Sequence, residues 1–85
     1  MTIPTDAGAI LDAARRHAGL TVQDLWVRCY GLGGMATHTE LAAYLSGEGE
    51  PSAVEYDVIA QALNDWHIER GENHPVPYAT GLDAR

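Results

Sequence analysis

Residues 52–70 read Ser-Ala-Val-Glu-Tyr-Asp-Val-Ile-Ala-Gln-Ala-Leu-Asn-Asp-Trp-His-Ile-Glu-Arg, the longest uninterrupted helical pattern in the chain. Ser52 and Glu55 have the spacing of a capping box, in which each side chain accepts a hydrogen bond from the other residue's backbone amide. Gly71 predicts the end of this helix, because glycine adopts left-handed backbone without a Cβ penalty. Apolar residues recur at spacings of three and four and predict one buried face, made of Val54, Val58, Ile59, Ala62, Leu63 and Trp66.

Two shorter helices are predicted at the beginning of the chain. Asp6 is placed to cap the first helix, and Gly19 is placed to end it. The second helix begins with a capping box between Thr21 and Asp24 and should run to about Tyr30. We expect both helices to pack against residues 52–70.

A third helix is predicted between a glycine-rich segment and the long helix. Three glycines in four positions, Gly31–Gly34, predict a flexible connector, because each glycine costs ~1 kcal/mol in a helix relative to alanine. Thr37 and Glu40 then form another capping box, and Gly47 closes the third helix.

The helical pattern disappears after Gly71. Pro75 and Pro77 predict extended backbone, and no stretch of the chain alternates at period two for long enough to predict a strand. The prediction is an all-α fold: a small four-helix domain, helix-turn-helix-like, over residues 1–71. Residues 72–85 are predicted as a C-terminal tail, either mobile or extended along the domain surface.

The composition indicates a globular domain that avoids polyanions. The 85 residues carry a formal net charge of −7, and all five basic residues are arginine. This acidity disfavours nucleic acid, because nonspecific binding depends on lysine and arginine displacing counterions from phosphates. Cys29 is the single cysteine, and neither a signal-peptide pattern nor a run of ~20 apolar residues occurs. We expect a cytoplasmic protein without a membrane span.

No motif predicts catalysis, a cofactor or a metal centre. The four histidines stand in different segments without His-Glu-x-x-His spacing, and Cys29 has no second cysteine at ligand spacing. Cys29 lies on the apolar face of the second helix, which predicts a small buried side chain and not a nucleophile. Gly31–Gly34 lacks the lysine and the serine or threonine of a phosphate loop. The prediction is a protein that is not an enzyme.

Carboxylates gather around the link before the long helix and form a candidate docking surface for a basic protein partner. An ordinary solvated surface is the alternative interpretation of the same residues. Two residues near the end of the long helix would extend an exposed apolar strip suited to a partner helix or to dimerisation. The candidate protein-binding residues are therefore Glu48, Glu50, Glu55 and Asp57, with His67 and Ile68.

Three stretches follow a known layout: Ala-Gly-Leu-Thr-Val-Gln-Asp-Leu at 18–25, Tyr-Leu-Ser-Gly-Glu-Gly-Glu-Pro-Ser at 44–52, and Val-Ile-Ala-Gln-Ala-Leu at 58–63. In this layout the chain resembles Cro/repressor-type helix-turn-helix domains. In that family the leucine-threonine pair opens the second helix, and the glycine-to-proline-serine link follows the recognition helix. The resemblance implies a helix-turn-helix fold and a transcription-related setting.

A second function therefore stays open, a DNA-binding helix-turn-helix regulator acting as a dimer. The residues that would carry it are Arg15, Arg16 and Arg28 on phosphates, with Thr37, His38 and Thr39 at the reading helix. Against it, the glycine-rich segment is longer than the family's tight turn, and the reading position lacks arginine, lysine, asparagine or glutamine. The leading hypothesis is a non-enzymatic regulatory or adaptor module that binds another protein.

Overall fold

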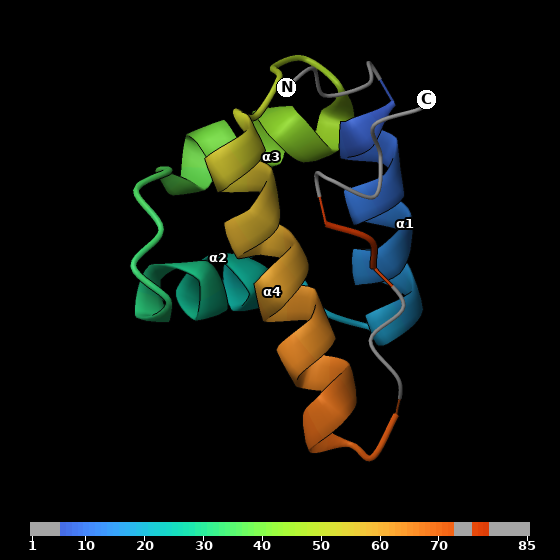
Figure 1. Ribbon diagram of the computed structural model, residues 1–85. Coiled ribbons are helices and arrows are strands. Elements are labelled where there is room, and N and C mark those ends of the chain that lie inside the picture. Colours follow the sequence, from blue (N-terminus) through green and yellow to red (C-terminus); the bar gives the residue numbers. More distant parts are fainter. Residues whose placement is uncertain (1–5, 73–75, 79–85) are drawn as a thin grey trace.

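The computed structural model describes residues 6–72 and 76–78 and contains four α-helices in this part of the chain. They are α1 (Ala7–Ala18), α2 (Val22–Gly31), α3 (His38–Ser46) and α4 (Ala53–Glu69). The described residues form no strand, so the predicted all-α, four-helix fold is confirmed (Figure 1).

α4 is the longest of the four helices, and α1 and α2 both pack against it (Figure 1). α3 packs against α1 and α2. Because these contacts come from several directions, apolar residues of all four helices meet in one core. The largest fully buried apolar side chains are Leu11, Leu25, Leu41, Tyr56 and Leu63.

The predicted helix ends are confirmed, with one exception. Capping boxes with both reciprocal hydrogen bonds begin α2, α3 and α4, and glycines with positive φ follow α1, α3 and α4, at positions 19, 47 and 71. The exception is Asp6. Its side chain makes no capping hydrogen bond, and its backbone at φ −93° and ψ 10° lies outside the extended conformation typical of an N-cap.

The buried face of α4 differs from the predicted one. Val54 is 73% exposed, and Trp66 is only partly buried. Tyr56, Ala60 and Asn64 are instead completely buried. The spacing correctly predicted a helix, but packing against both α1 and α2 buries a broader surface than one apolar stripe. Val54 lies in the same turn as the fully buried Tyr56 but on another face of the helix, which leaves it in solvent.

α1 and α3 approach each other closely at Gly8. A Cβ atom at this position would collide with the carbonyl oxygen of Tyr44, a backbone atom that cannot rotate away. Gly8 lies in the first turns of α1, so this contact joins the beginning of α1 to the end of α3 (Figure 1). Only glycine fits this crossing without displacing one helix.

The described part of the tail lies along α4. The backbone N–H of Val76 donates to Asn64 Oδ1 at 3.0 Å, and Asn64 Nδ2 donates to the Val76 carbonyl at 2.9 Å. Val76 is 3% exposed, and the Tyr78 hydroxyl donates to Gln61 Oε1 at 2.9 Å. This segment matches the predicted extension along the surface. Residues 73–75 and 79–85, which belong to the predicted tail, lie outside the described residues.

Candidate functional site

Exposed apolar side chains gather beside the loop that joins α2 to α3. Leu32 and Met35 in the loop are 44% and 89% exposed, and Val54 in the first turn of α4 is 73% exposed. All three line hollows in the surface between the loop and α4. Isolated exposed apolar residues are common, but a cluster of them around a concavity is typical of a binding surface.

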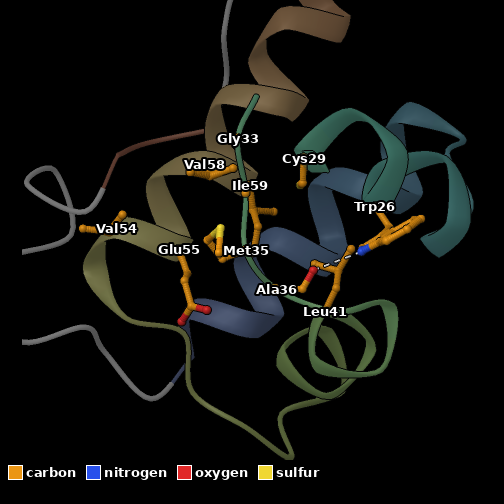
Figure 2. A pocket seen from close by; sticks show the side chains of 11 residues that line it. Trp26, Cys29, Gly33, Met35, Ala36, Leu41, Val54, Glu55, Val58 and Ile59 are labelled. Carbon is orange, nitrogen blue, oxygen red and sulfur yellow. Dashed lines mark hydrogen bonds between the residues drawn. The ribbon is translucent and has the colours of Figure 1, made fainter. Parts of the chain in front are cut away.

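Two hollows share Val54 and Val58 and therefore adjoin one another. The first has a volume of about 80 Å³ and is surrounded by residues of α2, the loop, α3 and α4 (Figure 2). The second, of about 430 Å³, is more open to solvent. We call the two hollows together the loop–α4 site, whose described lining is Trp26, Cys29, Leu32, Gly33, Gly34, Met35, Ala36, Leu41, Val54, Glu55, Asp57, Val58, Ile59, Gln61 and Tyr78.

The loop beside this site is anchored on both sides of Met35. Gly34 N–H donates to the Cys29 carbonyl at 2.9 Å, and Trp26 Nε1–H donates to the Ala36 carbonyl at 3.0 Å (Figure 2). A Cβ at Gly34 would lie 2.8 Å from the Cys29 oxygen, so the close approach requires glycine. The glycine content predicts a flexible connector. In the structure, Gly34 instead allows the loop to pack tightly against the end of α2.

Negative charge borders the loop–α4 site. Glu55 lines the first hollow and Asp57 lines the second, and no basic residue is among the described lining residues. Glu55 Oε1 accepts from the Ser52 amide, and Glu55 Oε2 accepts from the Tyr44 hydroxyl at 3.0 Å. Burial, together with this hydrogen bond to a carboxylate, raises the pKa of Tyr44 to about 12. The phenol therefore stays a neutral donor that holds the Glu55 carboxylate in place.

Cys29 contributes an apolar surface to the first hollow. The residue is 6% exposed, and burial raises the pKa of its thiol to about 11. At neutral pH the sulfur is therefore protonated, whereas a cysteine nucleophile requires the thiolate. Among the described residues, no three His, Cys, Asp or Glu side chains converge as a metal site would require.

The predicted acidic protein-binding residues occupy two separate places. Glu55 and Asp57 lie at the loop–α4 site. Glu48 and Glu50 are exposed in the link before α4, where Glu48 accepts a hydrogen bond from Ser46.

The expected apolar strip near the end of α4 is only partly present. Ile68 is 52% exposed, but His67 is 4% exposed, so the expectation that His67 extends an exposed surface is wrong. His67 Nδ1 lies 2.8 Å from Glu72 Oε1, and its Nε2 is buried without a hydrogen-bond partner among the described residues. The ring is buried because the α4 face that includes Asn64 also includes His67.

The arginines of the DNA-binding alternative are all paired with carboxylates. Asp12 accepts from Arg15 at 2.8 Å and from Arg16 at 2.9 Å, both within α1. Arg28 on α2 pairs with Glu69 on α4 at 3.2 Å. Arg15 and Arg16 lie in the last turn of α1, whereas Gly8 at the beginning of α1 meets α3 at Tyr44. These two arginines are therefore at the opposite end of α1 from that contact.

The predicted reading residues lie at the beginning of α3. Thr37 is the exposed N-cap, and its hydroxyl accepts from the Glu40 amide. The His38 and Trp26 rings form a T-shaped contact at a centroid distance of 6.1 Å, and Thr39 is exposed.

Comparisons with family models, curated proteins and solved structures found no match to this chain. Within residues 6–72 and 76–78, no helix has both the length and the apolar character needed to cross a bilayer.

Leu32, Met35 and Val54 were missed as site residues by the sequence interpretation. A usable signal was present, since large apolar residues occur inside a glycine-rich connector, where solvated loops normally carry polar side chains. Val54 gave no such signal, because its spacing matches the buried stripe of α4.

Proposed function

We propose that this protein is a small regulatory or adaptor module, without enzymatic activity, that binds another protein through the loop–α4 site. The observation that carries this proposal is the exposure of Leu32, Met35 and Val54 around a concave apolar surface. Covering one such side chain contributes ~1.5–3 kcal/mol to association when burial is complete. The resemblance to helix-turn-helix domains supports a transcription-related setting, in a cytoplasmic protein.

The polar groups of the loop–α4 site support a protein partner over a small-molecule substrate. The polar groups nearest the first hollow, Trp26 Nε1 and the Glu55 carboxylate, are already in internal hydrogen bonds. Catalytic and small-molecule sites normally direct a few polar groups at the ligand. An apolar surface bordered by carboxylates instead has the composition of a docking surface, with a desolvated centre and a charged rim.

Matched valine variants test this proposal. Val54→Ser removes an exposed valine from the loop–α4 site, whereas Val27→Ser removes one, 54% exposed, that lines neither hollow. Capture from a lysate of the native host should fall about tenfold for the first variant, equivalent to ~1.4 kcal/mol. It should stay unchanged for the second. Equal capture by both variants would reject the loop–α4 site as the docking surface.

The carboxylates that the sequence predicts as a docking surface are tested separately by charge reversal. Replacing Glu48, Glu50 and Asp57 with lysine should weaken capture of the same partner, because complementary charge steers association. Unchanged capture would remove these three carboxylates from the proposal and leave the apolar contact.

The DNA-binding alternative has weaker support, because its arginines are engaged with Asp12 and Glu69. If it holds, the chain should bind mixed-sequence DNA at low salt, and binding should weaken steeply as salt rises. Measuring fluorescence anisotropy of labelled DNA against salt separates the two functions.

A further inference from the structure

The first hollow of the loop–α4 site has the size and chemistry of a receptor for one apolar side chain. Its volume of about 80 Å³ exceeds the ~10–15 Å³ that one water molecule needs. It is about half of the ~150 Å³ apolar cavity known to accept benzene in another protein. A branched aliphatic side chain therefore suits this hollow better than an aromatic ring.

Water is a poor occupant of this hollow. A bound water needs two to four polar partners, but the inner wall consists of Cys29, Leu41 and Ile59. Trp26 Nε1–H is directed at the Ala36 carbonyl, and the Cys29 thiol is neutral (Figure 2). Filling the hollow with an aliphatic group replaces weakly held solvent with close packing.

The receptor is formed before a partner arrives. The bonds at Gly34 and Ala36 fix the loop on either side of Met35, whose 89% exposed side chain stands at the mouth of the hollow (Figure 2). Association costs less when the binding surface does not have to be ordered first. Met35 itself is unbranched and flexible, so it can adjust to the side chain that enters.

The charge around the site selects the flanking residues of the partner. Glu55 and Asp57 bring negative charge to the two adjoining hollows, and the whole chain carries a net charge of −7. A second copy of this chain would bring the same negative charge against them. A segment with lysine or arginine beside its aliphatic residue is complementary instead.

We infer that the loop–α4 site binds a linear segment of a protein partner that inserts one branched aliphatic side chain beside Trp26 and Leu41 and places a lysine or arginine against Glu55 and Asp57. This inference rests on the proposed function and specifies the chemistry of its partner. It requires the cavity, the anchored loop and the two carboxylates to act at one place.

Selection of random linear peptides displayed on phage, with the full chain immobilised, tests the inference. Enriched peptides should share leucine, isoleucine or valine next to lysine or arginine. Enrichment of acidic or purely aromatic sequences, or no enrichment, would overturn it. The comparison of Val54→Ser with Val27→Ser tests the docking surface whatever the chemistry of the partner. A negative peptide selection would therefore reject this inference without rejecting the proposed function.

Three variants then locate the selected peptides by fluorescence anisotropy. Cys29→Leu fills the hollow from its wall and should weaken binding at least tenfold. Val54→Trp covers the mouth from an exposed position and should do the same, which keeps the test valid if Cys29→Leu fails to fold. Replacing Glu55 with glutamine and Asp57 with asparagine removes both charges and keeps the capping box, because glutamine also serves in it.

The charge-neutral double variant should weaken binding about tenfold at low salt and little at high salt, as expected for two ion pairs near the surface. Selected peptides that bind all three variants as tightly as the unsubstituted protein would contradict the inference. Sedimentation showing a dimer that Val54→Ser dissociates would also overturn it, in favour of a second copy at this site.

Discussion

The two sides of α4 differ in how completely their apolar surface is covered. Towards α1 and the tail, Tyr56 and Asn64 are 0% exposed, and Gly8 lets the backbones of α1 and α3 touch. Towards the loop, Met35 and Val54 stand in solvent around two hollows. Both sides contain apolar residues, so composition does not separate them. The difference lies in coverage: the first side is closed by neighbouring segments, and the second leaves apolar side chains in solvent.

Among the predictions that test this contrast, a substitution at Gly8 has the largest expected effect. Gly8→Ala should lower the free energy of unfolding by about 3 kcal/mol, the upper part of the range for overpacking, because the added methyl meets a backbone oxygen. The measurement is urea unfolding followed by circular dichroism. The matched control is Gly31→Ala, where a Cβ has open space and should stabilise the end of α2 slightly. Equal stability of the two variants would show that the α1–α3 contact is not tight.

The hydrogen bonds between Asn64 and Val76 test how much the tail contributes to stability on the covered side of α4. Asn64→Ala leaves the buried N–H and carbonyl of Val76 without their partner, which should cost about 2 kcal/mol. Gln61→Ala removes two part-buried bonds, from the Tyr78 hydroxyl and to Asp65, and should cost about 1 kcal/mol because the released groups can reach solvent. Chemical denaturation of both variants gives the comparison. A larger loss for Gln61→Ala would place the main attachment of residues 76–78 at Tyr78.

A tyrosine pair provides the smallest effect, with opposite signs on the two sides. The buried hydroxyl of Tyr56 has no hydrogen-bond partner among the described residues, so Tyr56→Phe should stabilise the fold by about 1 kcal/mol. Tyr44→Phe loses the bond to Glu55 and should destabilise by about 1 kcal/mol. Thermal melts at neutral pH test both signs. Destabilisation by Tyr56→Phe would reveal a partner for that hydroxyl.

The same tyrosines determine how stability responds to alkaline pH. Burial is the largest cause that raises the pKa of both Tyr44 and Tyr56 from 10 to about 12. Because the folded state keeps the phenolic protons that the unfolded state releases, this stability is complete below pH 10 and is lost as pH rises towards 12. Tyr56→Phe should therefore flatten the loss of stability between pH 10 and 12.

The helices follow from local chemistry, which explains why the sequence predicted them. Each capping box joins residues three positions apart, and each terminal glycine acts on its own turn, so neither depends on distant parts of the chain. Asp6 is the exception because an acidic residue at the right position does not ensure cap geometry. The residues of the proposed interaction site were predicted only in part: Glu55 and Asp57 border the hollows, but His67 is buried and Glu48 and Glu50 are not among the lining residues.

The four helices, their boundaries and the acidic character of the protein follow from the amino-acid sequence alone, because they depend on neighbouring residues and on the sum of the charges. The tertiary structure was needed to show that Val54 is exposed, that Asn64 and His67 are buried, and that Arg28 pairs with Glu69. Those outcomes depend on which helix surfaces meet, and residues far apart in the chain set that. The loop–α4 site belongs to the second group, since α2, the loop, α3 and α4 all contribute to it.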